Sequence, residues 1–286
     1  MLRDLLAASR PISWVNTAYP FAAAYVLAGA GIGWLFAVGT FFFLVPYNLL
    51  MYGINDVFDY ESDLRNPRKG GVEGAMLAKE RHQILLWSSL ICTLPFAVVL
   101  LWAGHLQANI VLLISLAAVI AYSAPKLRFK ERPLLDSITS ATHFVSPAVY
   151  GWVLAGAAMT ETQWAVFGSF MLWGMASHAL GAIQDIVPDR EGGISSIATA
   201  ISARGTILLV LAAYICSGLL IYAALDGAAR WTAALALPYI ANILPHLQVE
   251  EHDSGTINKA WKRFLWINYL CGFALTMLLV YLLLLP

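Results

Sequence analysis

Long runs of apolar residues alternate with short polar segments along the whole chain. A helix needs about 20 apolar residues to cross a bilayer. Only helices and closed barrels satisfy every backbone hydrogen bond in lipid, and these runs lack the two-residue alternation of a membrane barrel. The pattern therefore predicts an all-α polytopic membrane protein with nine transmembrane helices, at about residues 11–29, 34–54, 83–104, 108–125, 134–156, 164–183, 205–225, 231–247 and 263–285.

The composition agrees with a membrane protein. Of the 286 residues 60% are hydrophobic and only 12% are charged, and the mean hydropathy is +0.71. A soluble domain carries about 25% charged residues. The net charge of zero gives no indication of a nucleic-acid partner. The three cysteines lie in apolar segments and are expected to be small buried side chains. We expect a single domain over residues 1–286.

The basic residues indicate how the helices are oriented. With nine helices, 16 of the 17 Lys and Arg residues lie in the N-terminal segment or in loops on the same side of the membrane, and only Arg230 lies opposite. Cytoplasmic loops carry the excess of Lys and Arg. The N-terminus and all the long polar loops are therefore expected at the cytoplasmic face of the cell membrane, and so is any chemistry.

Carboxylates gather where the second predicted helix ends. Residues spaced by three and four share one face of a helix. That spacing predicts a polar stripe, with Asp56 about 100° round from it, made of Asn48, Tyr52, Asn55, Asp59 and Asp63.

The end of the sixth predicted helix repeats this arrangement. Its stripe consists of Gly174, His178, Gly181, Asp185 and Asp189. The tripeptide Ile-Asn-Asp at 54–56 is echoed by Ile-Gln-Asp at 183–185. Two halves that each deliver an acidic helix end to the same side are expected to form one site between them.

The charged groups around these stripes predict a diphosphate site. Carboxylates four residues apart repel each other unless a cation neutralises them, and Mg²⁺ prefers such oxygen ligands and commonly bridges them to phosphates. Basic residues follow in two groups: Arg65, Arg68 and Lys69, and then Lys126, Arg128 and Lys130. Because the surrounding helices are apolar, the rest of the substrate is expected to be hydrophobic.

Two other interpretations compete with this one. Carboxylates at a helix end can simply be a solvated face, although two such stripes on one side, each followed by basic residues, make this less attractive. An ion or proton transporter also uses intramembrane carboxylates, but its acids sit near mid-span. Here the acids sit at helix ends, and only His143 and His178 are ionisable and well inside.

Three segments carry a resemblance to a known family. "NDVFDYESD" fits the N-D-x-x-D-x-x-x-D signature of the UbiA superfamily of intramembrane prenyltransferases, "QDIVPD" fits its second motif, and "YSAPKLRFK" looks like its fourth-helix exit. The resemblance covers essentially the whole chain. It implies a nine-helix bundle with a central cavity that opens at the cytoplasmic side.

Other segments narrow the resemblance. "SRPISWVNTAYPF", "DLRNPRKGGVEGAML" and "WGMASHALGAIQDIVPDRE" look like the lycopene elongases of bacterial C50 carotenoid pathways. This implies transfer of a dimethylallyl group from dimethylallyl diphosphate to lycopene, through C45 to a flavuxanthin-type C50 product. Another acceptor, such as a quinone precursor, a chlorophyllide or a glycerol lipid, is the alternative within the superfamily. Whether the product is hydroxylated is left open.

The resemblance also implies roles for individual residues. The implied Mg²⁺ ligands are Asn55, Asp56, Asp59, Asp63, Asp185 and Asp189. Tyr122 and Lys126, four residues apart, would act on the departing diphosphate from the fourth helix; the diphosphate-binding set is Arg10, Arg65, Arg68, Lys126 and Arg128. Candidates for a pocket around the acceptor and the allylic cation are Tyr47, Tyr52, Phe144, Trp173 and His178. The catalytic base is left open, and the diphosphate itself could serve.

Overall fold

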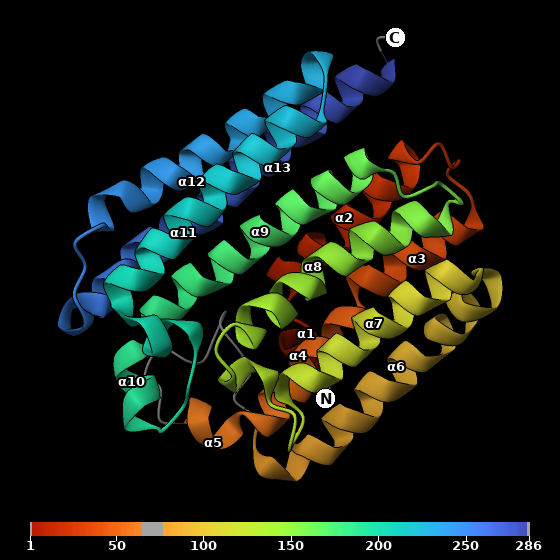
Figure 1. The fold of residues 1–286 in the computed structure, drawn as a ribbon. Coiled ribbons are helices and arrows are strands. Elements are labelled where there is room, and N and C mark those ends of the chain that lie inside the picture. Colours follow the sequence, from red (N-terminus) through yellow and green to blue (C-terminus); the bar gives the residue numbers. More distant parts are fainter. Residues whose placement is uncertain (1, 65–76, 285–286) are drawn as a thin grey trace. The chain divides into compact units, whose positions relative to one another are not determined.

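The computed structural model describes residues 2–64 and 77–284, and within these ranges every regular element is a helix (Figure 1). The chain forms two compact units. Unit 1 comprises residues 1–130 and 142–158, and unit 2 comprises residues 131–141 and 159–286. Helix α8 (Leu135–Leu154) gives its first residues to unit 2 and the remainder to unit 1. The expected single domain stays a prediction.

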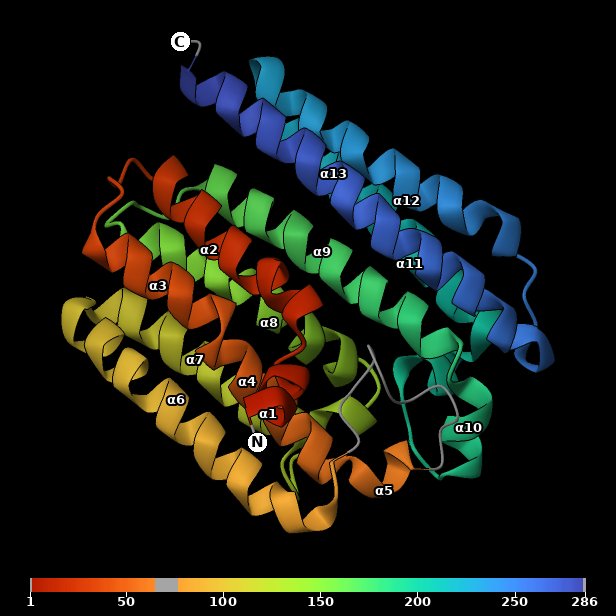
Figure 2. The same ribbon diagram turned by 180° about the vertical axis from the view of Figure 1, so that it is seen from behind.

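Unit 1 is built around α4, which packs against α6 and α7, while α2 packs along α3 (Figure 2). Its aromatic core brings the ring of Phe21 within 5.3 Å of the ring of Phe43 and 5.9 Å of the ring of Tyr150. A Cβ at Gly39 would fall 2.2 Å from Phe21 Cζ, so this close approach needs glycine. The helices are α1 (Leu2–Ala8), α2 (Trp14–Leu27), α3 (Trp34–Leu44), α4 (Pro46–Phe58), α5 (Tyr60–Asp63), α6 (His82–Ala103) and α7 (Leu106–Ser123).

The second predicted helix is broken, which corrects the prediction of one helix over 34–54. Pro46 cannot donate a backbone hydrogen bond, and α3 ends before it. The carbonyls released at the break are bound by side chains: Asn48 Nδ2 donates to Phe43 O at 2.8 Å, and Thr17 Oγ1 donates to the same oxygen at 2.6 Å. Asn48 therefore supports the break, although the sequence placed it on the polar stripe.

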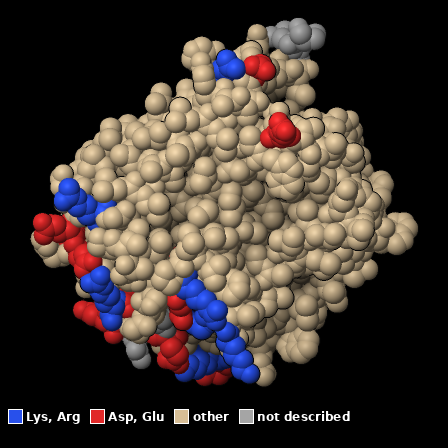
Figure 3. All heavy atoms as spheres, viewed as in Figure 1, with Lys and Arg blue, Asp and Glu red and all other residues tan. Residues whose placement is uncertain are grey.

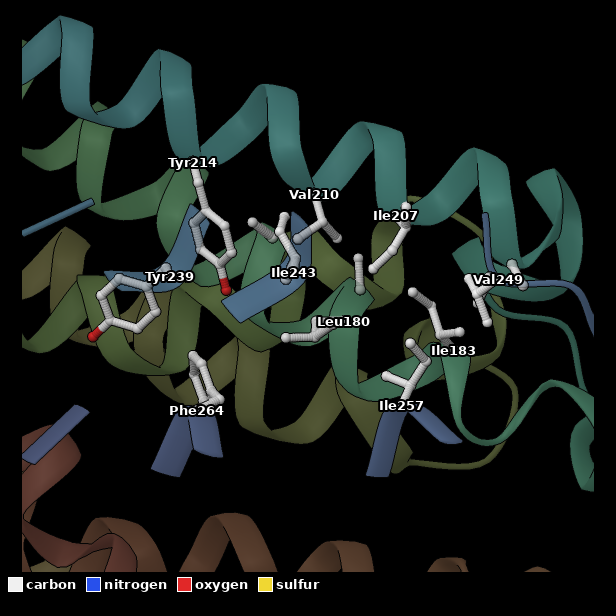
Figure 4. Packing of buried hydrophobic residues seen from close by; sticks show 14 of the residues in the cluster. Leu180, Ile183, Ile207, Val210, Tyr214, Tyr239, Ile243, Val249, Ile257 and Phe264 are labelled. Carbon is white, nitrogen blue, oxygen red and sulfur yellow. The ribbon is translucent and has the colours of Figure 1, made fainter. Parts of the chain in front are cut away.

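Unit 2 has its core between α9 and α11, which lie side by side along most of their length (Figures 1 and 2). On α11, Ile207, Val210 and Tyr214 are three and four residues apart and all face inward (Figure 4). Helices α12 and α13 complete the core. The elements are α9 (Glu161–Ile183), α10 (Ile186–Glu191), α11 (Ile197–Ala224), α12 (Ala236–Ile243), α13 (Asn258–Leu284) and the 3-10 helices η5 (Gly227–Leu235), η6 (Leu244–His246) and η7 (Glu251–Ile257).

Two predicted helices of unit 2 have different limits in the structure. The seventh was expected at 205–225, but α11 begins at Ile197, because Ser196 and Thr199 form a reciprocal cap on its first turn. A kink follows at Ser202, whose φ of 74° is non-helical. The eighth was expected as one helix over 231–247, but 3-10 segments flank the short α12 on both sides.

The described residues contain six stretches long and apolar enough to cross a membrane. They are Trp34–Phe58, Lys79–Ala103, Leu106–Ser123, Glu161–Ile183, Ile197–Ala224 and Glu251–Leu283. The other three predicted spans coincide with the shorter or less apolar helices α2, α8 and α12. The count of nine and the cytoplasmic opening stay predictions. On the face drawn in Figure 3 wide areas carry no Lys, Arg, Asp or Glu, as contact with lipid requires.

Candidate functional site

The acidic stripe of unit 1 keeps its four-residue spacing across the junction of α4 and α5. Asp59 N donates to Asn55 O at 2.9 Å, and Asp63 N donates to Asp59 O at 2.8 Å. These are helical hydrogen bonds, so the three side chains leave the backbone on one stripe. The stripe geometry predicted from the sequence is therefore present in the structure.

Asp59 is the buried centre of this stripe. Its side chain is only 3% exposed, and its Oδ1 forms ion pairs with Lys130 Nζ and, at 3.7 Å, with Arg128 Nη2. A buried carboxylate is costly unless it is paired. Burial raises the pKa of the Asp59 carboxyl above its usual range, and the charge of Lys130 offsets only part of this rise. Arg128 also donates to Phe58 O at 3.2 Å, where a cation stabilises the end of α4.

Asp56 faces the N-terminal segment of the chain. Its Oδ1 accepts a hydrogen bond from Arg10 Nη2 at 2.7 Å, and the guanidinium of Arg10 lies 4.2 Å from the centre of the Tyr52 ring. Asp56 and Arg10 thus form a second buried ion pair near the acidic stripe. The predicted diphosphate ligand Arg10, the predicted metal ligand Asp56 and the predicted pocket residue Tyr52 are in contact with one another.

The end of α7 lies against the end of α4. Ser123 Oγ donates to Asn55 Oδ1 at 2.8 Å, which orients the amide of a predicted metal ligand. One residue earlier, the ring of Tyr122 meets the ring of His143 edge-on, with centroids 5.3 Å apart. Tyr122 is thus next in the chain to a residue that contacts the acidic stripe, and its own ring packs against α8.

The basic residues of this region have strained backbones. Among the described residues, five non-glycine residues have positive φ, and three of them are Arg10 (49°), Lys126 (72°) and Arg128 (39°). Such conformations cost on the order of 1–3 kcal/mol each and persist at functional sites where the surroundings enforce them. That all three were predicted as diphosphate ligands connects the strain with an anion site.

Lys126 lies beyond the end of α7, which corrects the expectation that Tyr122 and Lys126 both extend from one helix. Helix α7 ends at Ser123, because Ala124 precedes Pro125 and is held in an extended conformation (ψ 141°). Lys126 is exposed in the turn that follows. Lys130, four residues further on, is the lysine that reaches Asp59.

The acidic end in unit 2 is a turn between two helices. Helix α9 ends at Ile183, and Asp185 precedes the first residue of α10. Asp189 N donates to Asp185 O at 2.8 Å, so the predicted spacing of these two carboxylates is kept. Both side chains are partly exposed. Gln184 is held by Asn258, whose Nδ2 donates to its Oε1 at 2.7 Å.

The remaining members of the second stripe are packing positions. A Cβ at Gly174 would lie 2.9 Å from Ala141 Cβ, and one at Gly181 would lie 3.1 Å from the Trp261 ring. These glycines therefore let neighbouring groups approach α9 closely. His178, between them, lies beside Asp136 of α8.

The predicted aromatic pocket residues lie in both units. Tyr47 is fully buried with its ring 5.1 Å from that of Phe43, and Phe144 is partly buried on α8. The ring of Trp173 stacks on that of Phe264 in the core of unit 2, with ring centroids 6.1 Å apart. Tyr47 and Trp173 thus contribute to packing wherever else they act. The predicted diphosphate ligands Arg65 and Arg68 lie outside the described residues.

The donor atoms of the stripe suit Mg²⁺. Amide and carboxylate oxygens of Asn55, Asp59 and Asp63 are the hard ligands this ion prefers, with water and phosphate oxygens completing its shell. The buried charge of Asp59 requires a cation, which Lys130 and Arg128 provide here. In the part of the chain that the structure describes, no three Asp, Glu, His or Cys side chains form a metal-binding group. The stripe therefore fits a metal that substrate oxygens also hold.

Sequence reasoning did not select three polar residues that the structure brings into contact with predicted site residues. Lys130 was noticed in the basic run but not chosen over Lys126, because the turn at Pro125 cannot be read from spacing. Ser123 and Asp136 carried no signal beyond a polar residue at the end or start of an apolar helix.

Six apolar helices in the described part of the chain, each long enough to cross a membrane, define this chain as a polytopic membrane protein. The model of the UbiA prenyltransferase family matches residues 17–283. A "Lycopene elongase/hydratase" of Corynebacterium glutamicum is 51% identical over 280 residues, covering 98% of this chain and 97% of the relative. The chain therefore belongs to the UbiA prenyltransferase family and is a prenyltransferase. The family resemblance of the sequence motifs is confirmed.

Two further comparisons extend this result. The "C(50) beta-cyclic carotenoids biosynthesis protein LbtBC" of a Dietzia species is 51% identical over 281 residues, covering 98% of this chain and 65% of the relative. A solved UbiA homologue from Archaeoglobus fulgidus bound to DMAPP and Mg²⁺ has the same fold, with a TM-score of 0.67 at 16% identity over 94% of this chain and 98% of that one. The family is one of enzymes, which favours transfer over the ion-transport alternative.

Proposed function

We propose that this chain transfers a dimethylallyl group from dimethylallyl diphosphate to an end of lycopene, giving C45 and then C50 carotenoids and releasing diphosphate. The observation that carries the proposal is the 51% identity, over nearly the full length of both chains, with a lycopene elongase/hydratase. The membrane is the cytoplasmic one, with the N-terminus and the acidic helix ends on the cytoplasmic side, as the distribution of basic residues indicates.

The donor diphosphate binds at the acidic helix ends. Asn55, Asp59 and Asp63 in unit 1, and Asp185 and Asp189 in unit 2, would hold Mg²⁺. Bound there, Mg²⁺ would supply positive charge against the diphosphate oxygens. Asp56 acts chiefly through Arg10, to which it is paired at 2.7 Å, and so holds this arginine at the edge of the site.

The basic residues of unit 1 stabilise the leaving group. When the C1–O bond of the donor breaks, the electron pair departs with the diphosphate, so charge develops where Lys126, Arg128, Arg10 and the Tyr122 hydroxyl can meet it. Donors that are already held in place cost no reorganisation during the reaction. The left-handed backbones of Arg10, Lys126 and Arg128 support such fixed placement.

The apolar helices govern the second half of the reaction. The allylic cation must meet the acceptor before it meets water, and a dry cavity prevents hydrolysis. The terminal double bond of lycopene supplies the electron pair for the new C–C bond, which leaves a tertiary cation on the acceptor. Loss of a proton from a neighbouring carbon gives an alkene, while addition of water followed by proton loss gives an alcohol.

The acceptor is tested with membranes that contain the expressed chain. Dimethylallyl diphosphate and Mg²⁺ are added with lycopene, a quinone precursor, a chlorophyllide or a glycerol lipid in separate reactions, and products are identified by chromatography and mass. We expect C45 and C50 products from lycopene at a rate at least tenfold above that of any other acceptor. Asp59→Asn should remove them.

The exposed Asp226, which pairs with Arg230 at 3.0 Å, provides the matched control. Asp226→Asn makes the same chemical change at a side chain that is 96% exposed, and it should leave the product yield unchanged. Prenylation of a quinone precursor, a chlorophyllide or a glycerol lipid without C45 product would replace lycopene by that acceptor. No prenylated product from any of them would refute the proposal.

A further inference from the structure

A buried acid and a histidine form a pair within unit 2, away from the acidic helix end. Asp136, in the first turn of α8, is fully buried. Its Oδ1 accepts a hydrogen bond from Ser137 N at 2.6 Å, and its Oδ2 accepts one from Ile197 N at 2.7 Å. His178 Nε2, from α9, lies 3.7 Å from the same Oδ2. One carboxylate therefore connects three helices.

The two members of the pair differ in exposure. The side chain of Asp136 is completely enclosed, whereas 19% of the side-chain surface of His178 is exposed. The residues on either side of His178 are more buried: Ser177 is 6% exposed and Ala179 is 2% exposed. His178 is thus the member of the pair that another molecule can touch.

The position of His178 along α9 relates it to the acidic helix end. It lies five residues before Ile183, the last residue of α9, and Asp185 follows in the turn after that helix end. At 1.5 Å per residue, His178 is about 7 Å along α9 from the end that leads to this carboxylate. If diphosphate binds beside Asp185, then His178 is at the depth of the hydrocarbon part of the substrates.

Helix packing alone explains why an acid stands at position 136, but it does not explain why a histidine stands beside it at position 178. The hydrogen bond from Ile197 N already ties α8 to the start of α11, and the bond from Ser137 N, within α8, gives the other carboxylate oxygen a partner. A carboxylate beside an imidazole orients the ring through the nitrogen that faces it. A base whose orientation is set by a third group is the arrangement used for proton transfer in enzymes.

We propose that His178 is the base that removes the proton from the prenylated acceptor cation, and that Asp136 is the positioning residue that holds the imidazole. The inference rests on the proposed function, and it names the group that ends that reaction. The C–H electron pair next to the cationic carbon becomes the new double bond, and the proton moves to the imidazole. With the proton of the neutral ring on Nε2, toward Asp136, the accepting nitrogen is Nδ1.

The test measures how the acceptor cation is divided among its products. Every product with the new C–C bond comes from the same cation, so the fraction that ends as the normal alkene does not depend on how much enzyme is folded. A general base contributes roughly 10²–10⁴-fold to proton transfer. For His178→Gln we therefore expect the ratio of normal alkene to alcohols and isomeric alkenes to fall at least about tenfold. Asp136→Asn, which keeps one acceptor oxygen, should lower it in the same direction.

Two comparisons make the result decisive. His105→Gln is the matched control, because His105 bonds Val153 O at 2.7 Å in unit 1 and should leave the product ratio unchanged. Imidazole added to His178→Ala should raise the alkene fraction again, which no packing role explains.

If Asp136→Asn does not fold, His178→Gln decides alone. An unchanged ratio in His178→Gln overturns the inference while the proposed function stands; a wild type without C45 or C50 product refutes the proposed function itself, and the inference with it.

Discussion

The two acidic helix ends look alike in sequence but differ in environment. In unit 1, Asp59 is 3% exposed and pairs with Lys130 and Arg128. In unit 2, Asp185 lies in the turn before α10 and Asp189 lies in α10, and both are partly exposed. The next residue, Arg190, bonds Glu251 of η7 at 2.7 Å. The same motif chemistry is thus built into a buried ion-pair network in one unit and into an accessible turn in the other.

Because of this difference, the two motifs are expected to contribute differently to stability and to catalysis. Removing the charge of a buried carboxylate leaves the cations paired with it without their partner, so the first motif is expected to support both the fold and the reaction. A partly exposed carboxylate in a turn carries little folding energy. The second motif is therefore expected to support the reaction alone.

The largest effects are expected from Asp59→Asn and Asp185→Asn. Loss of a metal ligand removes several kcal/mol of transition-state stabilisation, so each variant should lose at least roughly 10³-fold in turnover. The free energy of unfolding should fall by about 3 kcal/mol for Asp59→Asn and by less than about 0.5 kcal/mol for Asp185→Asn. Rate assays and thermal melts of the purified proteins measure both. Equal melting temperatures for the two variants would show that the two motifs do not differ in their contribution to stability.

Removal of divalent metal should abolish turnover without unfolding either unit. Chelation by EDTA is expected to stop product formation, and added Mg²⁺ should restore it. Because Lys130 and Arg128 neutralise Asp59 in the fold itself, the helical circular dichroism should persist in EDTA. Full activity of the chelated wild type would contradict a metal-dependent reaction.

Lys126→Ala tests a basic residue that lies exposed in the turn after α7 and has a strained backbone. If Lys126 stabilises the departing diphosphate, its loss should slow the reaction by about 10²–10³-fold. The factor should be the same for lycopene and for any surrogate acceptor, at saturating Mg²⁺. A loss confined to lycopene would instead place this lysine at the acceptor.

Ser123→Ala should have a smaller effect, confined to unit 1. The variant removes the hydrogen bond that orients the Asn55 amide, worth about 0.5–1.5 kcal/mol, which corresponds to roughly a 2–10-fold weaker apparent affinity for Mg²⁺. Ser115→Ala on the same helix is the control, because Ser115 Oγ donates to Val111 O of its own helix. Identical Mg²⁺ titrations of the two variants would show that Ser123 does not orient a ligand.

Arg190→Ala should have the smallest effect of all. Its pair with Glu251 joins side chains that are 49% and 34% exposed, and such surface pairs contribute less than about 1 kcal/mol. We expect turnover within about twofold of the wild type and an unfolding transition shifted by only a few degrees. A loss comparable to that of Asp185→Asn would mean that Arg190 itself contacts the substrate.

The parts of the molecule that the sequence predicted well depend on local periodicity. The spacing of Asn55, Asp59 and Asp63 survives in the structure because one run of helical hydrogen bonds connects them. The limits of α6, α7 and α9 lie within a few residues of the predicted spans. In these helices the apolar pattern and the backbone periodicity agree.

The parts that were missed depend on chain breaks and on long-range partners. Pro125 ends α7, so the choice of Lys126 by helical spacing overlooked Lys130. Pro46 divides the second predicted helix, and Asn48 is used to bind the carbonyl at that break. Asp136 reads as an ordinary polar residue at a helix start, because its partners His178 and Ile197 are distant in sequence.

The most direct test of the account compares two quantities in one reaction. The purified chain in lipid vesicles receives lycopene, Mg²⁺ and dimethylallyl diphosphate carrying an isotopic label in the dimethylallyl group, and released diphosphate and label in carotenoid are both counted. A dimethylallyl transferase predicts one diphosphate per dimethylallyl group added, with C45 appearing before C50 and neither quantity rising in Asp59→Asn. Diphosphate release without label in the carotenoid, or C45 and C50 formation at the wild-type rate by Asp59→Asn, would contradict it.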